Sequence, residues 1–141
     1  MITLIGLTGA SGMVFVIYGA WKGVAGPRGD AQPFARQTVR AICRDWNVAE
    51  FRARASAYEN RKLTNSNLKA FLQNNNARLG PLKGIHWSIA SAPLLSREAG
   101  TTIEVTLDCR FAKVDHQRVH ILCNEQATKW QMTAITFPKT P

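Results

Sequence analysis

Histidines and carboxylates in the second half of the sequence are the residues whose chemistry stands out first. His86 and His120 fall on the polar side of alternating segments, and Glu104 and Asp108 do so on the segment between them. Imidazole and carboxylate groups bind divalent metals where three or more of them converge. Polar side chains on an open sheet face are far commoner than metal sites. We therefore expect surface residues here, with no metal and no cofactor.

The cysteines are the other residues with metal or redox chemistry. There are three, Cys43, Cys109 and Cys123, and no CxxC spacing, which argues against a zinc site. Cys109 and Cys123 fall on the apolar side of predicted strands, where a free cysteine behaves as a small hydrophobic residue. We expect free thiols, with a disulfide as the alternative. We find no catalytic motif in the sequence.

Strands must position most of these residues, because from residue 84 onward the apolar side chains recur with a period of two. The segment TTIEVTLDCRF (101–111) shows the alternation most clearly. General acid–base catalysis requires a titratable group near the substrate, and the apolar side contains no carboxylate and no histidine. We therefore expect a filled core and no enzymatic activity. The residues predicted to face the core are Ile85, Trp87, Ile89, Ile103, Val105, Leu107, Cys109, Phe111, Val119, Ile121, Cys123, Trp130 and Met132.

Residues 112–117 are predicted to form a hairpin turn. The apolar faces match across it only if paired residue numbers add to an even value near 228. This register places Asp108 opposite His120, a cross-strand contact worth up to about 1 kcal/mol. In the last strand, KWQMTAITF (129–137), the apolar phase shifts after Ala134, which predicts a bulge.

Helices are predicted before the strands. The apolar spacing from Ala35 to Trp46 indicates one helix, and Asn47 resembles the cap of a second that continues to about Tyr58. Residues 59–67 are polar and turn-like, and Thr64 or Ser66 is expected to cap a further helix. That helix is expected to end at LGP (79–81), where Gly80 can adopt the left-handed C-cap conformation and Pro81 blocks continuation. The residues before these helices, 27–33, have the composition of a linker.

The first 26 residues are predicted to form a transmembrane anchor. Residues 2–21 contain no ionisable side chain, and 20 helical residues span about 30 Å, the thickness of the hydrocarbon core. A signal peptide with a weak cleavage site at 23–26 is the alternative, but no basic residue precedes the run, which is long for that role. Small residues suited to packing against another membrane helix are Gly6, Thr8, Ala10, Gly12 and Gly19.

The orientation of the anchor is open. Lys22 and the arginines that follow it lie on the C-terminal side of the apolar run, which favours a cytoplasmic domain. Single-anchor proteins of the bacterial envelope often place a small α+β domain outside the cytoplasm instead. We lean towards the periplasmic side.

Helices followed by an antiparallel meander predict an α+β fold. We expect a domain over 34–138 with its helices on one face of a curved antiparallel sheet of about four strands. The broken helical pair at 34–58, the segment ARLGPLKG (77–84) and the strand KWQMTAITF resemble the NTF2-like (cystatin-like α+β) superfamily. The resemblance implies either a scaffold domain of an envelope assembly or, as in ketosteroid isomerases, a pocket for a small ligand or catalysis.

The net charge is +9, with a pI near 10.1, which favours anionic partners. The basic residues are scattered and the aromatic residues sit at apolar-periodic positions, so nucleic acid is not expected. Our main hypothesis is a non-enzymatic accessory or scaffold subunit that binds other subunits of a secretion, respiratory or photosynthetic membrane complex. The alternatives are a tethered ligand-binding or catalytic domain and a domain that binds anionic lipid or nucleic acid. The expected docking face comprises Glu104, Asp108, Arg110, Arg118 and His120.

Overall fold

A computed structural model describes residues 26–94, 100–126 and 129–139 of the chain. The chain divides into two compact units, Met1–Asp30 and Ala31–Pro141. In the first unit, only the helical residues 26–30 are described. The elements in chain order are α1 (Gly26–Cys43), α2 (Val48–Arg54), α3 (Ala57–Lys62), α4 (Asn65–Leu79), β1 (Leu82–Ala90), β2 (Thr101–Phe111), β3 (Gln117–Gln126) and β4 (Lys129–Thr136).

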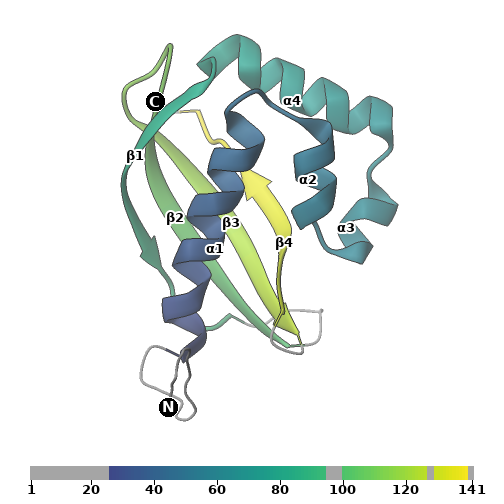
Figure 1. The fold of residues 1–141 in the computed structure, drawn as a ribbon, viewed down its shortest axis with the longest axis vertical. Coiled ribbons are helices and arrows are strands. Elements are labelled where there is room, and N and C mark those ends of the chain that lie inside the picture. The colour runs from purple at the N-terminus through teal and green to yellow at the C-terminus, as the bar shows by residue number, and fades with distance from the viewer. Residues whose placement is uncertain (1–25, 95–99, 127–128, 140–141) are drawn as a thin grey trace. The chain divides into compact units, whose positions relative to one another are not determined.

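The second unit has an α+β fold built on one open sheet. Its four strands are antiparallel and lie in the order β1-β2-β3-β4, so each pairs with its sequence neighbour. In Figure 1, α1 crosses in front of β2 and β3, and the short helices α2 and α3 lie beside β4. Helices on one face of a four-stranded antiparallel sheet are what the sequence predicted.

The structure differs from the prediction at the start of the described chain. The linker expected over 27–33 is helical, because α1 begins at Gly26 and includes Pro33. Gly and Pro clusters indicate turns only locally, whereas Ala31 and Ala35 are fully buried in the core, and that packing favours a longer helix.

Within the described residues, no helix combines the length and the apolar character needed to cross a membrane. Almost all of the predicted anchor, including Gly6, Thr8, Ala10, Gly12 and Gly19, lies outside the residues that the structure describes.

Side-chain caps set the helix boundaries after α1. The Asn47 side chain accepts a hydrogen bond from the Glu50 amide at 3.0 Å, which confirms the predicted cap of α2. The helix ends at Arg54, before the predicted Tyr58, because the Ser56 amide instead donates to the Met132 carbonyl at 2.8 Å. Residues 57–62 then form α3, where the sequence predicted a polar turn from 59.

The long helix α4 begins and ends as the sequence predicted. Thr64, one of the two expected caps, accepts from the Asn67 amide at 3.1 Å. Gly80 terminates the helix with φ +75°, a conformation that glycine adopts readily. Trp46 also has a positive φ, 54°, and its indole Nε1 donates to the Gly80 carbonyl at 3.0 Å. This bond ties the turn after α1 to the end of α4.

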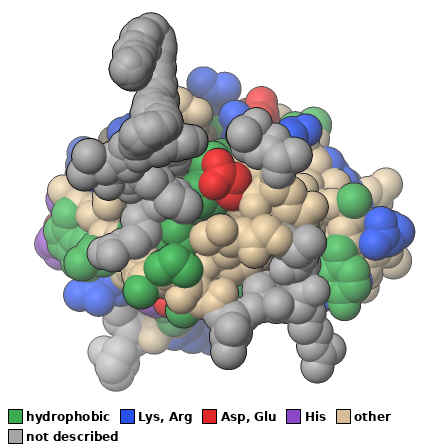
Figure 2. All heavy atoms as spheres, turned by 90° about the horizontal axis from the view of Figure 1, so that it is seen from below, with side chains coloured by type: hydrophobic (Ala, Val, Ile, Leu, Met, Phe, Trp, Pro, Cys, Tyr) green, Lys and Arg blue, Asp and Glu red, His purple; other side chains and the backbone are tan. Residues whose placement is uncertain are grey.

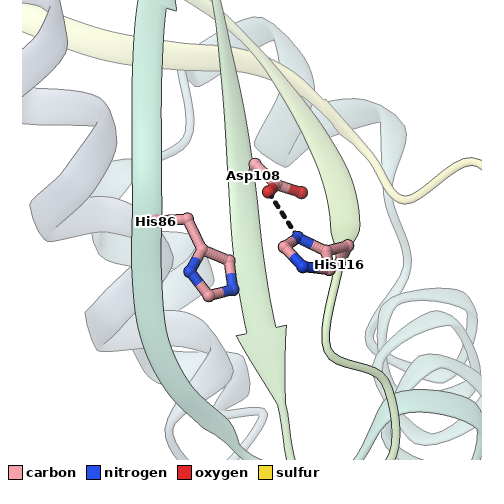
Figure 3. Close-up of side chains that lie close together, drawn as sticks. All are labelled: His86, Asp108 and His116. Carbon is pink, nitrogen blue, oxygen red and sulfur yellow. Dashed lines mark hydrogen bonds and ion pairs between the residues drawn. The ribbon is translucent and has the colours of Figure 1, made fainter.

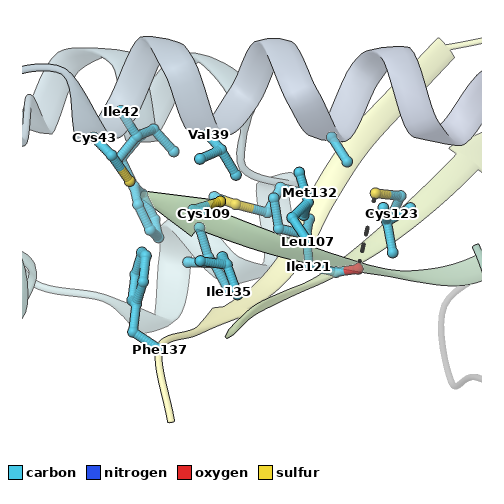
Figure 4. Packing of buried hydrophobic residues seen from close by; sticks show 14 of the residues in the cluster. Val39, Ile42, Cys43, Leu107, Cys109, Ile121, Cys123, Met132, Ile135 and Phe137 are labelled. Carbon is cyan, nitrogen blue, oxygen red and sulfur yellow. Dashed lines mark hydrogen bonds between the residues drawn. The ribbon is translucent and has the colours of Figure 1, made fainter. Parts of the chain in front are cut away.

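A continuous hydrophobic core lies between the helices and the sheet, and Figure 4 shows Val39 and Ile42 of α1 facing Leu107 and Ile121 of the strands. Most residues predicted to face inward are buried there. The confirmed members are Ile103, Val105, Leu107, Cys109, Phe111, Val119, Ile121, Cys123 and Met132.

The inward prediction is wrong for part of β1. A register shift between Ile85 and Trp87 makes His86 the extra residue of a bulge. The bulge reverses the alternation that follows it, so Trp87 and Ile89 are 38% and 61% exposed. Ser88 turns inward in their place and donates a hydrogen bond to Gln32 of α1 at 2.8 Å.

The register between β2 and β3 has the predicted parity but not the predicted pairs. Asp108 pairs with Arg118 rather than with His120, and Thr106 pairs with His120. The reason is a tighter turn than expected: Phe111 and Val114 exchange two backbone hydrogen bonds, of 2.8 and 3.3 Å. A shift of two residues keeps every side chain on its predicted face.

The bulge expected in β4 is confirmed. The pairing of β3 with β4 shifts between Leu122 and Cys123, whose partners are Ala134 and Met132. Both Met132 and Ile135 are thereby buried in the core.

Candidate functional site

The outer face of the sheet, opposite the hydrophobic core, carries the residues that the sequence predicted as a docking face. The ladder between β2 and β3 pairs Asp108 with Arg118 and Thr106 with His120 on this side, and Glu104 and Arg110 share the phase of Asp108 in β2. Arg110 and Arg118 are exposed, whereas Asp108 is only 5% exposed. His120 lies 3.6 Å from Glu104 and makes a hydrogen bond of 3.0 Å with Thr106.

Two large apolar side chains, Trp87 and Ile89, project from β1 on the same outer side. Trp87 pairs with Asp108, which in turn pairs with Arg118, so the three lie in one row across β1, β2 and β3. The Arg118 guanidinium lies 4.9 Å from the centre of the Trp87 ring, a cation–π contact. The row combines exposed apolar surface with positive charge.

Next to this row, three side chains form an imidazole–carboxylate cluster: His86, Asp108 and His116 (Figure 3). Their potential ligand atoms all lie within 4.8 Å of one another. The two imidazole rings stack, with centroids 4.6 Å apart and an interplanar angle of 26°. Both histidines are exposed, whereas Asp108 is buried, so the cluster has a fixed carboxylate beneath two accessible rings.

Hydrogen bonds orient both rings of the cluster. The Asp108 carboxylate accepts from Nδ1 of His116 at 2.8 Å. Nε2 of His86 lies 2.9 Å from the backbone carbonyl of Asp115, which accepts. A ring that donates from one nitrogen keeps a lone pair on the other when it is neutral, and the donating nitrogen itself can bind a cation that displaces its proton.

The sequence did not reveal this cluster. We expected His86 on a regular polar phase, His116 in the turn, and Asp108 beside His120. The bulge at His86 and the tighter turn at Phe111–Val114 bring the two histidines to the same carboxylate. The ten-residue connection between β1 and β2 (91–100) leaves their mutual register free, so no spacing in the sequence indicated this meeting.

A basic groove lies on the other side of β1, where α1 and α2 approach the start of that strand. It encloses about 530 Å³, and its charged lining consists of Arg40, Arg44, Glu50, Arg54 and Lys83. Glu50 forms an ion pair with Arg54, four residues further along α2. The lining therefore carries a net positive charge.

The three cysteines are buried free thiols, as the sequence predicted. Burial raises the pKa of Cys43 well above its usual value. Burial, and then the neighbouring Asp108 carboxylate, raises the pKa of Cys109 to about 12. Burial also raises the pKa of Cys123 to about 12. Because the thiolate is the reactive form, these side chains are packing residues in the folded protein.

Basic side chains are not gathered in one patch on the face that Figure 2 shows: the Lys and Arg residues lie scattered around its margin. A track for a nucleic-acid backbone requires a continuous basic surface interleaved with aromatic residues.

Comparison with known proteins does not extend this description. No protein-family model, no curated protein and no solved structure matches the chain.

Proposed function

We propose that this chain is a non-enzymatic accessory or scaffold protein of a membrane complex and that it binds a partner subunit through the outer face of its sheet. The observation that carries the proposal is the exposure of Trp87 and Ile89, 38% and 61%, on a face opposite the packed helices. Exposed aromatic and aliphatic side chains beside arginines are typical of the centre of protein interfaces.

Charge indicates the kind of partner. The chain carries a net charge of +9, and Arg110 and Arg118 lie exposed around the apolar residues of this face. Opposite potentials accelerate association and select partners. The proposed partner is therefore an acidic surface of another subunit, with an apolar depression that accommodates Ile89 and the edge of Trp87.

The proposed location rests on the first 26 residues, whose apolar run has the length of a membrane span. An anchor would hold the domain at the membrane, where other membrane proteins are the available binding partners. The helix-on-sheet arrangement also supports the NTF2-like resemblance, which we retain as a proposal. The hydrophobic core between helices and sheet favours the scaffold role over the ligand-binding role of that superfamily. The pocket beside the core, lined by Phe51, Leu68 and Ile135 among others, has a volume of only about 140 Å³, whereas ligand sites typically have about 300 Å³ or more.

Site-specific photocrosslinking in intact cells tests the docking proposal. A photoreactive residue placed at Ile89 in the full chain should give a discrete cross-linked band containing an acidic membrane subunit. The matched control is the same residue at Tyr58, which is 50% exposed but lies on α3. The variant Ile89→Lys should release the chain from the complex and lower its native mass after gentle solubilisation. Equal cross-linking at both positions, or none at Ile89, would contradict the proposal.

The basic groove supports a second candidate function, binding of an anionic ligand such as a lipid headgroup. Arg40 lies in α1, Arg44 directly follows that helix, and Lys83 lies in β1. All three line one concave site. Sedimentation of the full chain with anionic lipid vesicles should fall when Arg40 and Arg44 are both changed to Gln, and it should fall as salt rises. The double change Arg61→Gln and Lys62→Gln, on α3, is the control of equal charge. Equal losses in both double variants would exclude a specific groove.

A further inference from the structure

We propose that the imidazole–carboxylate cluster is a binding site for one divalent transition-metal ion, with Zn²⁺ as the best match. His86, Asp108 and His116 would supply the three protein ligands, and water would complete the coordination. This inference is independent of the docking proposal, since it concerns the cation that these side chains bind and not the partner of the outer face.

The donor set selects the class of metal. Two imidazole nitrogens and one carboxylate oxygen suit Zn²⁺, Ni²⁺ and Cu²⁺, whereas Mg²⁺ and Ca²⁺ prefer sites made of oxygen ligands. Three protein ligands with an open fourth position are common for zinc outside structural sites. The described cysteines do not compete, because Cys109 and Cys123 are buried on the opposite side of the sheet with raised pKa values.

The candidate ligand atoms are close enough that a small movement of the side chains would allow them to bind one zinc ion. Zinc bonds of about 2.0–2.1 Å in a tetrahedral arrangement separate neighbouring ligand atoms by about 3.3 Å. The candidate ligand atoms lie within 4.8 Å of one another, and Nδ1 of His116 lies 2.8 Å from Asp108. The metal would replace the proton shared by this last pair. His116 is exposed over 70% of its side chain, so its ring can rotate to meet the ion at little cost.

The surrounding structure holds the Asp108 carboxylate in place, and the nearby Arg118 guanidinium is in contact with an aromatic ring. Asp108 is 5% exposed and belongs to the central ladder of β2 with β3, so its position is fixed. The guanidinium of Arg118, the cross-strand partner of Asp108, lies over the Trp87 ring. A bound ion would join β1 at its bulge to the turn between β2 and β3, and so clip together two segments that otherwise meet through ring stacking and hydrogen bonds.

Zinc binding to the full chain, purified without a histidine tag, tests the proposal. Titration against a chromogenic zinc chelator should show one Zn²⁺ per chain, and Mg²⁺ should not displace it. His86→Ala and His116→Ala should each weaken the affinity at least about tenfold, as should Asp108→Asn. His120→Ala is the matched control: it removes a histidine of the same sheet face that bonds to Thr106 instead, and its affinity should equal that of the unchanged chain.

Cobalt provides a second measurement that does not depend on affinity. Co²⁺ added to the unchanged chain should give the intense visible absorption of a four-coordinate ion, and His116→Ala should abolish it. The circular dichroism of each variant without metal identifies any that fails to fold, and the two exposed histidine variants should retain the native spectrum. Absence of stoichiometric zinc binding, or an affinity that falls equally in His120→Ala, would overturn the proposal.

Discussion

Replacing one isoleucine at a time tests the reversal of side chains that follows the bulge in β1. Period-two alternation predicts that Ile89 and Ile103 both face the core. In the structure Ile103 is fully buried, whereas Ile89 is 61% exposed. Ile89→Ala and Ile103→Ala are the same chemical change in the edge strand β1 and the central strand β2, so the difference reports how each side chain is packed and buried.

The expected magnitudes follow from the two exposures. Truncating a fully buried isoleucine to alanine removes its transfer free energy and leaves a cavity, which costs about 2–5 kcal/mol. A fully buried isoleucine side chain contributes about 2–3 kcal/mol by transfer alone. Only about two fifths of the surface of Ile89 is buried, and its truncation leaves no enclosed cavity. Ile89→Ala should therefore cost about 1 kcal/mol. We expect the free energies of unfolding of the two variants to differ by about 1–4 kcal/mol.

The assay is equilibrium unfolding of the full chain by urea in a mild nonionic detergent, followed by circular dichroism. An unchanged slope against denaturant would show that the unfolded states are comparable and that the midpoints report stability. Losses within about 1 kcal/mol of each other would refute the reasoning, because they would place Ile89 in the core and remove the bulge at His86.

Three further changes follow from single features of the structure. Gly100→Ala should destabilise the fold by more than about 2 kcal/mol in the same urea assay, because φ is +90° there and a Cβ would overlap the carbonyl oxygen of Glu125; a neutral result would contradict that geometry. Asn47→Ala should cost about 1 kcal/mol through loss of the α2 cap, while Asn47→Ser should retain most of the stability. Cys109 and Cys123 have folded pKa values near 12 against ordinary values of 9.0, so their stabilisation is complete below pH 9 and is lost between pH 9 and 12. In that window each thiol should lower the free energy of unfolding by about 1.4 kcal/mol per pH unit. If the free energy of unfolding of Cys123→Ala fell with pH as steeply as that of the unchanged chain, this prediction would be contradicted.

The face of most strand residues could be predicted from the sequence because a strand places successive side chains on opposite sides. In β2 the alternation from Ile103 to Phe111 indicated the buried face correctly, and the bulge of β4 was visible as a change of phase. The caps Asn47 and Thr64 and the terminating Gly80 were also predicted, since each acts on backbone groups a few residues away.

The candidate site depended on information that a local pattern does not carry. His86 meets Asp108 and His116 only because β1 contains an extra residue and pairs with β2 across a long connection, whose register the sequence leaves free. The two-residue register shift at the turn likewise preserved every face but exchanged the partner of Asp108 from His120 to Arg118. Alternation indicated which side of the sheet the residues of β2 and β3 occupy, but the bulge in β1 reversed it for Trp87 and Ile89. Strand pairing in the folded protein decided which residues become neighbours on each side. The register of that pairing depends on the turns and bulges of the whole sheet, which a local pattern does not reveal.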